Sequence, residues 1–352
     1  MRIRSSLLAL LVPAVVVISG SSAPAQVEPD LPRAAAAAEQ SGAAEEVLAI
    51  SIDGLSVAAI QRLGREGMPN LHVFMDKGAS TLNARTERER TVTLPNHTGM
   101  VTGRRIEAAT GGHGVTWNDN RLRPRTVQRA AGHGVESVFT TVDDAGGSTA
   151  LFAAKTKFRL WTRSWPRAID RTTVMESNGA LVKQAIADIT TSQRDFRFLH
   201  LSLPDVAGHA HGWMSRPYLD AARRVDALLG EVVSSVTADP ERRARTTILL
   251  TSDHGGHRAG HENPRLVDNF RVAFMARGAG VEQGVDLYAI NEGYRDPGSR
   301  RTTYGMARPP VRNGMVANVS LDLLGLPPVA GSEFDLTQDL MLARTPTPAA
   351  RG

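Results

Sequence analysis

The apolar and polar positions along the chain predict short strands that alternate with helices. Apolar runs typical of buried strands occupy 47–52, 136–141, 196–202, 246–251 and 271–275. Helix-like segments occupy 58–65, 93–102, 178–189, 218–236 and 314–324. This alternation predicts an α/β fold, in which a mostly parallel central sheet carries helices on both faces.

The first 25 residues have the pattern of a secretory signal peptide. The chain opens with two arginines, Arg2 and Arg4, and continues with an apolar run, Leu7–Ile18, that is short for a bilayer span. An Ala-x-Ala cleavage site ends at Ala25. We therefore expect a signal peptide at 1–25 and a secreted or periplasmic protein with no membrane span after cleavage; an uncleaved membrane anchor is the alternative.

The rest of the chain is expected to form one catalytic domain. Residues 26–45 show no strand alternation and contain Pro29 and Pro32, so we expect a disordered linker there. About 300 residues suffice for one large α/β domain, which we place at 46–345 and expect to be followed by a flexible tail at 346–352.

The composition restricts the chemistry available to the protein. The chain has no cysteine, so disulfides and thiolate zinc sites are excluded, and a metal site must use histidines and carboxylates. The formal net charge of +5 suits nucleic acid, an anionic substrate or simple solubility. Because the arginines are scattered and there are only four Trp and four Tyr, we expect no specific nucleic-acid binding.

Aspartates follow three of the predicted strands. Asp53, Asp205 and Asp253 come directly or shortly after the strands at 47–52, 196–202 and 246–251. A single aspartate after a strand is usually a helix cap. Because ligands of open α/β sheets bind outside the carboxyl ends of the strands, three such residues together predict a shared site.

Histidines accompany two of these aspartates. His209 follows Asp205 by four residues, His254 follows Asp253 directly, and His261 lies seven residues further on. Carboxylates mixed with imidazoles suit zinc best, although manganese or iron is possible. Six candidate ligands exceed the needs of one tetrahedral ion, so two divalent ions are expected. His211 and His257 are left out, since a lone loop histidine is more often solvated.

Thr93 is the candidate nucleophile. It opens the predicted helix at 93–102, with Pro95 in the first turn, where a missing N–H costs nothing. Unpaired backbone N–H groups at a helix N-terminus favour an alkoxide and a phosphoryl oxygen, and a neighbouring divalent cation activates a hydroxyl. A plain helix cap is the alternative role.

Five motifs resemble the nucleotide pyrophosphatase/phosphodiesterase family of the alkaline phosphatase superfamily. They occur in the family's order between about 46 and 332: Ile-Ser-Ile-Asp53-Gly, Thr93-Leu-Pro-Asn-His, His113-Gly-Val-Thr-Trp-Asn118, Pro-Asp205-x-x-Gly-His209 and Ser-Asp253-His254-Gly. The resemblance implies a zinc-dependent phosphoric ester hydrolase with a small anionic phosphate-ester substrate. It also implies in-line attack by Thr93 on phosphorus, a covalent phospho-threonine and its hydrolysis by water.

The resemblance also assigns the site residues. It implies one zinc held by Asp205, His209 and His261. It implies a second zinc held by Asp53, Asp253 and His254, which also binds Thr93. Asn118 would donate to a transition-state oxygen, and Leu94 occupies the substrate-binding position where the family often has an aromatic residue.

Three other functions share parts of this pattern. A phosphonate hydrolase or a phosphomonoesterase would use the same metals and nucleophile with an added cationic contact, for which Lys155, Arg159 and Arg163 are available. A catalytically silent anion-binding protein would be expected to have lost ligands, and none appears lost. The physiological substrate and the oligomeric state are not indicated by the sequence.

Overall fold

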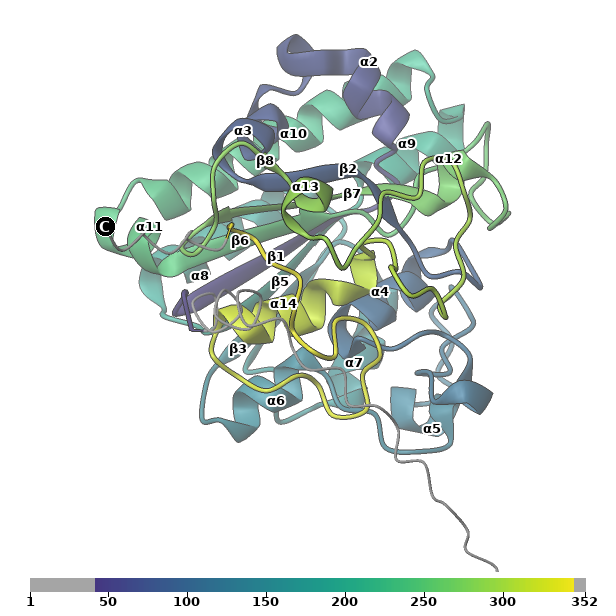
Figure 1. The fold of residues 1–352 in the computed structure, drawn as a ribbon, viewed down its shortest axis with the longest axis vertical. Coiled ribbons are helices and arrows are strands. Elements are labelled where there is room, and N and C mark those ends of the chain that lie inside the picture. Colours follow the sequence, from purple (N-terminus) through teal and green to yellow (C-terminus); the bar gives the residue numbers. More distant parts are fainter. Residues whose placement is uncertain (1–41, 345–352) are drawn as a thin grey trace, which may run out of the picture.

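The computed structural model describes residues 42–344. Its centre is an eight-stranded sheet with the order β4-β3-β5-β1-β6-β7-β2-β8 (Figure 1). The strands are β1 Glu46–Ile52, β2 Ala79–Arg85, β3 Thr149–Ala153, β4 Arg171–Val174, β5 Phe196–Leu201, β6 Thr246–Thr251, β7 Arg271–Gly278 and β8 Val285–Asp286. The five strands from β4 to β6 run parallel, and β7 is antiparallel to both β6 and β2. The predicted mostly parallel sheet is confirmed.

Helices cover both faces of the sheet (Figure 1). One apolar layer lies between the sheet and α3 Pro69–Lys77, α8 Asn178–Thr191 and α10 Arg216–Thr237. The other lies under α4 Thr93–Thr102, α6 Val138–Asp144, α7 Arg159–Ser164 and α14 Val316–Leu323. The remaining helices are α2 Val57–Gly67, α5 Val127–Ala131, α9 Leu203–His211, α11 Pro240–Arg245, α12 Val267–Phe270 and α13 Leu287–Ile290, with 3₁₀ turns at Ala108–Thr110, Thr156–Phe158 and Asn313–Met315.

One predicted strand is wrong. Residues 136–141 belong largely to helix α6, although Val138, Phe139 and the threonines favour strands. Ser137 caps this helix: its hydroxyl accepts the N–H of Thr140, and the Thr140 hydroxyl accepts a hydrogen bond from the Ser137 N–H. Local capping therefore outweighs strand propensity here.

The described residues include only part of the segments expected at the two ends of the chain. The expected signal peptide, most of the expected linker and the expected tail at 346–352 lie outside the described residues. The last linker residues are part of the fold, because the N–H groups of Gly42 and Ala44 donate to the carbonyls of Asp322 and Leu323. Among residues 42–344, no helix is both long and apolar enough to cross a membrane.

Candidate metal and catalytic site

The central parallel strands bring the three predicted aspartates together. β5, β1 and β6 are neighbours, and Asp53, Asp205 and Asp253 lie just beyond their carboxyl ends. The turn after β1 is very close to the start of α9, since the Asp205 N–H donates to the Asp53 carbonyl. Gly54, with φ +69°, makes this approach possible, because a Cβ there would lie 2.9 Å from Asp205 atoms.

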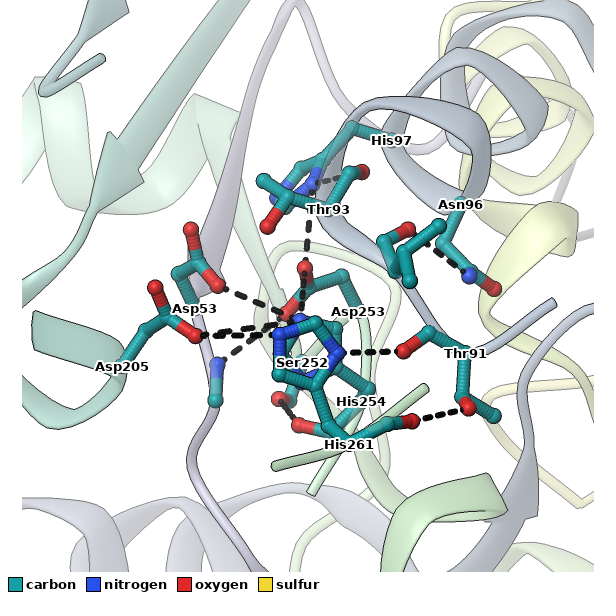
Figure 2. Close-up of polar contacts among 12 residues, drawn as sticks. Asp53, Thr91, Thr93, Asn96, His97, Asp205, Ser252, Asp253, His254 and His261 are labelled. Atoms are coloured by element: carbon teal, nitrogen blue, oxygen red, sulfur yellow. Dashed lines mark hydrogen bonds and ion pairs between the residues drawn. The ribbon is translucent and has the colours of Figure 1, made fainter. Parts of the chain in front are cut away.

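Two of the predicted histidines, His254 and His261, meet these carboxylates (Figure 2). His254 Nε2 lies 3.5 Å from Asp53 Oδ1, 3.1 Å from Asp253 Oδ2 and 4.0 Å from Asp205 Oδ1. The rings of His254 and His261 stack with their centroids 3.6 Å apart. Five of the six residues expected to be ligands thus converge.

The groups divide into two overlapping clusters. Asp53, Asp253 and His254 form one, and Asp205, His254 and His261 form the other. His209 joins the second cluster, with its Nε2 3.4 Å from Asp205 Oδ1 and 3.0 Å from His261 Nε2. Its side chain is 44% exposed, whereas the other five are buried, so His209 lies at the mouth of the site.

Hydrogen bonds fix the orientation of two of the imidazoles. His261 Nδ1 contacts the Thr91 carbonyl at 2.6 Å, and His254 Nδ1 contacts the Gly255 carbonyl at 2.8 Å. A carbonyl only accepts, so Nδ1 carries the proton in both rings. When such a ring is neutral, it directs the lone pair of Nε2 at the carboxylates, as a metal ligand must.

Four buried atoms at this point lack a hydrogen-bond partner among the described residues. They are Asp53 Oδ1, Asp205 Oδ1, Asp253 Oδ2 and His254 Nε2. A buried polar atom without a partner is costly, and here three acceptor oxygens and one imidazole nitrogen face one another. This donor set fits divalent cations that bind through oxygen and imidazole.

The charges of the site depend on one another. Burial opposes the ionised form of Asp53, but the ammonium of Lys155 and the imidazoles of His200 and His254 outweigh it and hold the pKa of Asp53 well below its usual range. Burial likewise lowers the pKa of His254, yet the nearby aspartates outweigh it and raise the pKa to about 9. An excess of negative charge thus surrounds His254 in the protein alone.

Lys155 bridges the two clusters. Its ammonium contacts Asp53 Oδ2 at 2.6 Å and Asp205 Oδ2 at 2.5 Å, and its side chain is 17% exposed. The expected cationic contact for a substrate is therefore committed to two carboxylates. Arg159 and Arg163 line a separate hollow of about 220 Å³ together with Trp117.

Thr93 is the first residue of α4 and is buried. Figure 2 shows it on the side of the helix that faces Asp53 and Asp253. His97, one turn further on, links it to the cluster: Nδ1 donates to the Thr93 carbonyl at 2.8 Å and lies 3.4 Å from Asp253 Oδ2. The buried start of α4 therefore lies beside the carboxylates.

Asn118 lies against the same helix start. Its Oδ1 accepts the N–H of Leu94 at 2.9 Å and contacts the Lys157 ammonium at 3.0 Å. Both bonds engage the amide oxygen, so the NH₂ group is the end of the side chain that is available to donate. The Leu94 side chain is fully buried in the core, which does not support its expected contact with substrate.

Sequence reasoning missed two buried histidines beneath the cluster, His97 and His200. His97 occurs in the quoted Thr-Leu-Pro-Asn-His motif, four residues after Thr93 and so on the same face of the helix. His200 stands inside an apolar strand, where an imidazole is unusual. Burial lowers the pKa of both rings, that of His97 to about 4. The two tryptophans of α7 and its end, Trp161 and Trp165, are buried in the core.

Known proteins share this architecture. The model of the type I phosphodiesterase/nucleotide pyrophosphatase family matches residues 47–270. Murine ectonucleotide pyrophosphatase/phosphodiesterase 5, solved as an inactive variant in complex with AMP, superposes with a TM-score of 0.63 at 14% identity, covering 84% of this chain and 99% of that one. A second structure of that murine protein gives a TM-score of 0.60 at 15% identity, with the same coverage.

Local sequence similarity extends to a group of transferases. GPI ethanolamine phosphate transferase 1 is 27% identical over 143 residues in Yarrowia lipolytica and 37% identical over 90 residues in Mus musculus. These matches cover 41% and 24% of this chain, but only 15% and 9% of the relatives. With the fold, the motif order and the family match in agreement, the chain belongs to the type I phosphodiesterase/nucleotide pyrophosphatase family.

Proposed function

We propose that the protein hydrolyses phosphodiester or pyrophosphate bonds with two bound divalent ions, most suitably zinc, and with Thr93 as nucleophile. The observation that carries this proposal is the set of four buried atoms without partners, which Asp53, Asp205, Asp253 and His254 direct at one another beside the start of α4. Bound divalent ions would supply positive charge opposite the attacking and leaving oxygens.

The residues of the chain have distinct parts in this reaction. Asp205, His209 and His261 would hold one ion, and Asp53, Asp253 and His254 the other. The Thr93 hydroxyl would attack phosphorus in line and lose its proton, and the bond from phosphorus to the opposite ester or anhydride oxygen would break to release the leaving group. Water would then hydrolyse the resulting phospho-threonine. The murine neighbour is described as inactive when a threonine is replaced by alanine, which supports a threonine nucleophile.

Asn118 would stabilise the transition state. Its amide oxygen is occupied by Leu94 and Lys157, so the NH₂ group can donate to a non-bridging phosphoryl oxygen. An adjoining hollow of about 430 Å³, lined by Lys155, Asn178 and Val206 among others, offers room for an ester group. The AMP bound by the murine neighbour agrees with a small phosphate-ester substrate.

We infer a preference for diesters from the cations next to the site. The Lys155 ammonium contacts two carboxylates, and the Lys157 ammonium contacts both oxygens of Asn118. Neither is free to clamp the extra negative charge of a monoester, whereas a diester presents an ester group there. Diesters should therefore react at least about tenfold faster in kcat/KM, equivalent to ~1.4 kcal/mol of transition-state binding.

Turnover of bis(p-nitrophenyl) phosphate, p-nitrophenyl phosphate and phosphonoacetate by zinc-loaded protein tests this preference. Because the two nitrophenyl esters share a leaving group, the comparison needs correction only for intrinsic reactivity. Equal or inverted rates would favour the monoesterase or phosphonate hydrolase, with Arg159 and Arg163 as the first residues to replace. No turnover of any substrate by ion-loaded protein would favour a silent anion-binding protein.

Transfer to an alcohol is a second candidate function. It is favoured by the local identity to GPI ethanolamine phosphate transferase 1, whose name describes transfer of an ethanolamine phosphate group. Product analysis with bis(p-nitrophenyl) phosphate and excess glycerol distinguishes hydrolysis from transfer to an alcohol. A hydrolase should release mainly p-nitrophenyl phosphate, and a transferase should form the glycerol ester.

A further inference from the structure

His200 is a fully buried imidazole that touches a proposed ion ligand without belonging to either proposed ligand set. It lies near the end of β5, in register with Ser51 on β1 and Ala153 on β3. Its Nε2 lies 3.0 Å from Asp53 Oδ2. The ring therefore reaches the carboxylate from β5, the strand next to β1.

The second ring nitrogen determines where the proton lies. The backbone N–H of Ala154 donates to His200 Nδ1 at 3.2 Å and is shared with the His200 carbonyl at the same distance. A backbone N–H can only donate, so Nδ1 must accept with its lone pair. The proton of the ring is then on Nε2, and His200 donates a hydrogen bond to Asp53 Oδ2.

This bond distinguishes the two oxygens of Asp53. Oδ2 contacts the Lys155 ammonium at 2.6 Å as well as His200, whereas Oδ1 has no hydrogen-bond partner among the described residues. Oδ1 is also the oxygen that faces His254 Nε2, at 3.5 Å. One oxygen is thus anchored by two donors, and the other is directed at the ion cluster.

Of the two donors, His200 is the more rigidly placed. Its ring packs against Phe158 and His97, with centroids 4.4 and 4.8 Å away, and its backbone is held inside the sheet. Lys155 reaches Asp53 by a flexible four-carbon chain and is shared with Asp205. The direction of the Asp53 carboxylate therefore depends mainly on His200.

We propose that His200 is a positioning residue that presents Asp53 to an ion through Oδ1 alone. The inference rests on the proposed two-ion function, but concerns a residue outside its ligand set. Groups that orient metal ligands typically change metal affinity by 10–100-fold when they are removed. Loss of the His200 hydrogen bond should accordingly weaken one of the two ions and leave the other in place.

Three substitutions separate the hydrogen bond from the volume of the ring. H200F keeps an aromatic ring and loses both polar contacts. H200N places its amide near Nδ1, so it retains a contact with Ala154 but falls short of Asp53. H200Q reaches the position of Nε2 and can still donate to Asp53. As a matched control, H257F removes another histidine–aspartate bond, His257 to Asp268 at 2.9 Å, outside the ion clusters.

Zinc binding to the metal-depleted full-length proteins is measured by competition with a chromophoric chelator, together with circular dichroism, kcat and KM. We expect two equivalents for wild type and H257F. H200F and H200N should keep one strong equivalent and bind the other about 10–100-fold more weakly, with a lower kcat. The zinc affinity of H200Q should lie within a few-fold of the wild-type affinity.

Wild-type affinity for both ions in H200F and H200N would overturn the inference. Equal weakening in H200Q and H200N would also overturn it, because the donor to Asp53 would then be irrelevant. If H200F does not fold, the comparison of H200Q with H200N carries the test. A wild-type protein that binds no zinc would overturn the proposed function, and the inference with it.

Discussion

At the scale of single residues, hydrogen bonds to one atom of a side chain determine which other atom is left to face the ion site. Nδ1 of His254 and of His261 donates to a backbone carbonyl, and Asp53 Oδ2 accepts from His200 and Lys155. The other ring nitrogens and the other oxygen of Asp53 face one another. The residue types and their places at strand ends were predictable from the sequence, because the carboxyl ends of parallel strands meet. The partners of Lys155 and His200 were not, since they depend on strand order.

Replacement of Thr93 tests the residue proposed as nucleophile. T93A should lower kcat by at least about 10³-fold, because the hydroxyl that attacks phosphorus is gone, while T93S should retain measurable activity. Zinc affinity should change far less than turnover, since six ligands remain. Rates are measured with bis(p-nitrophenyl) phosphate, and a phosphorylated peptide containing residue 93 is sought by mass spectrometry after rapid quenching. An active T93A enzyme would rule out Thr93 as the nucleophile.

At the scale of elements, the fold was most predictable where the strands are buried and long. β1, β5, β6 and β7, and the helices α8 and α10, lie where the apolar pattern places them. β2 was missed because its sequence, Ala-Ser-Thr-Leu-Asn-Ala-Arg, has few apolar residues, and β4 because it is short and at the sheet edge. Segment 136–141 was assigned to a strand because propensity was weighed without the capping contacts of Ser137.

Gly54 links element geometry to the site. In G54A, the left-handed backbone costs about 1 kcal/mol, and the new Cβ would also lie 2.9 Å from Asp205. Gly111 is the matched control: its φ is +90°, but a Cβ there would meet nothing within 4 Å. We expect G111A to lose only the stability that an alanine in a left-handed backbone costs. G54A should lose more stability, and it should also lose zinc affinity. Chemical denaturation and zinc titration of both variants measure this; equal losses would show that the close approach is unimportant.

At the scale of the whole molecule, two apolar layers on opposite faces of one sheet hold the structure together without disulfides. The site lies at the carboxyl ends of the central strands, where loops from both layers meet (Figure 1). The absence of cysteine was visible in the sequence and excluded thiolate ligands. The segment after α14 could not be predicted, because it has little regular structure and is held by side-chain hydrogen bonds.

Asp335, in this C-terminal segment, should make stability depend on pH. Its buried carboxyl accepts the N–H groups of Asp339 and Leu340, and burial together with the charge of Asp339 raises its pKa to about 8. Because the carboxyl is protonated in the folded protein and ionised in the unfolded chain, stability falls as the pH rises from about 4 to 8. The fall is at most ~1.4 kcal/mol per pH unit.

The D335N variant isolates this effect. An amide in the same place cannot ionise, so D335N should lose less stability than wild type between pH 5 and pH 8. Denaturation midpoints of both proteins, measured with a chelator present so that ion binding does not contribute, give the difference. Parallel pH profiles for the two proteins would show that Asp335 is ionised in the fold.

The most direct test of the two-ion account is stepwise reconstitution of the metal-depleted protein. Hydrolysis of bis(p-nitrophenyl) phosphate is followed while zinc is added, and bound zinc is counted by elemental analysis. The account predicts no turnover after exhaustive chelation and full recovery only when two equivalents are bound, because the proposed reaction uses both ions. Full activity in the chelated protein, or complete recovery with one bound equivalent, would contradict it.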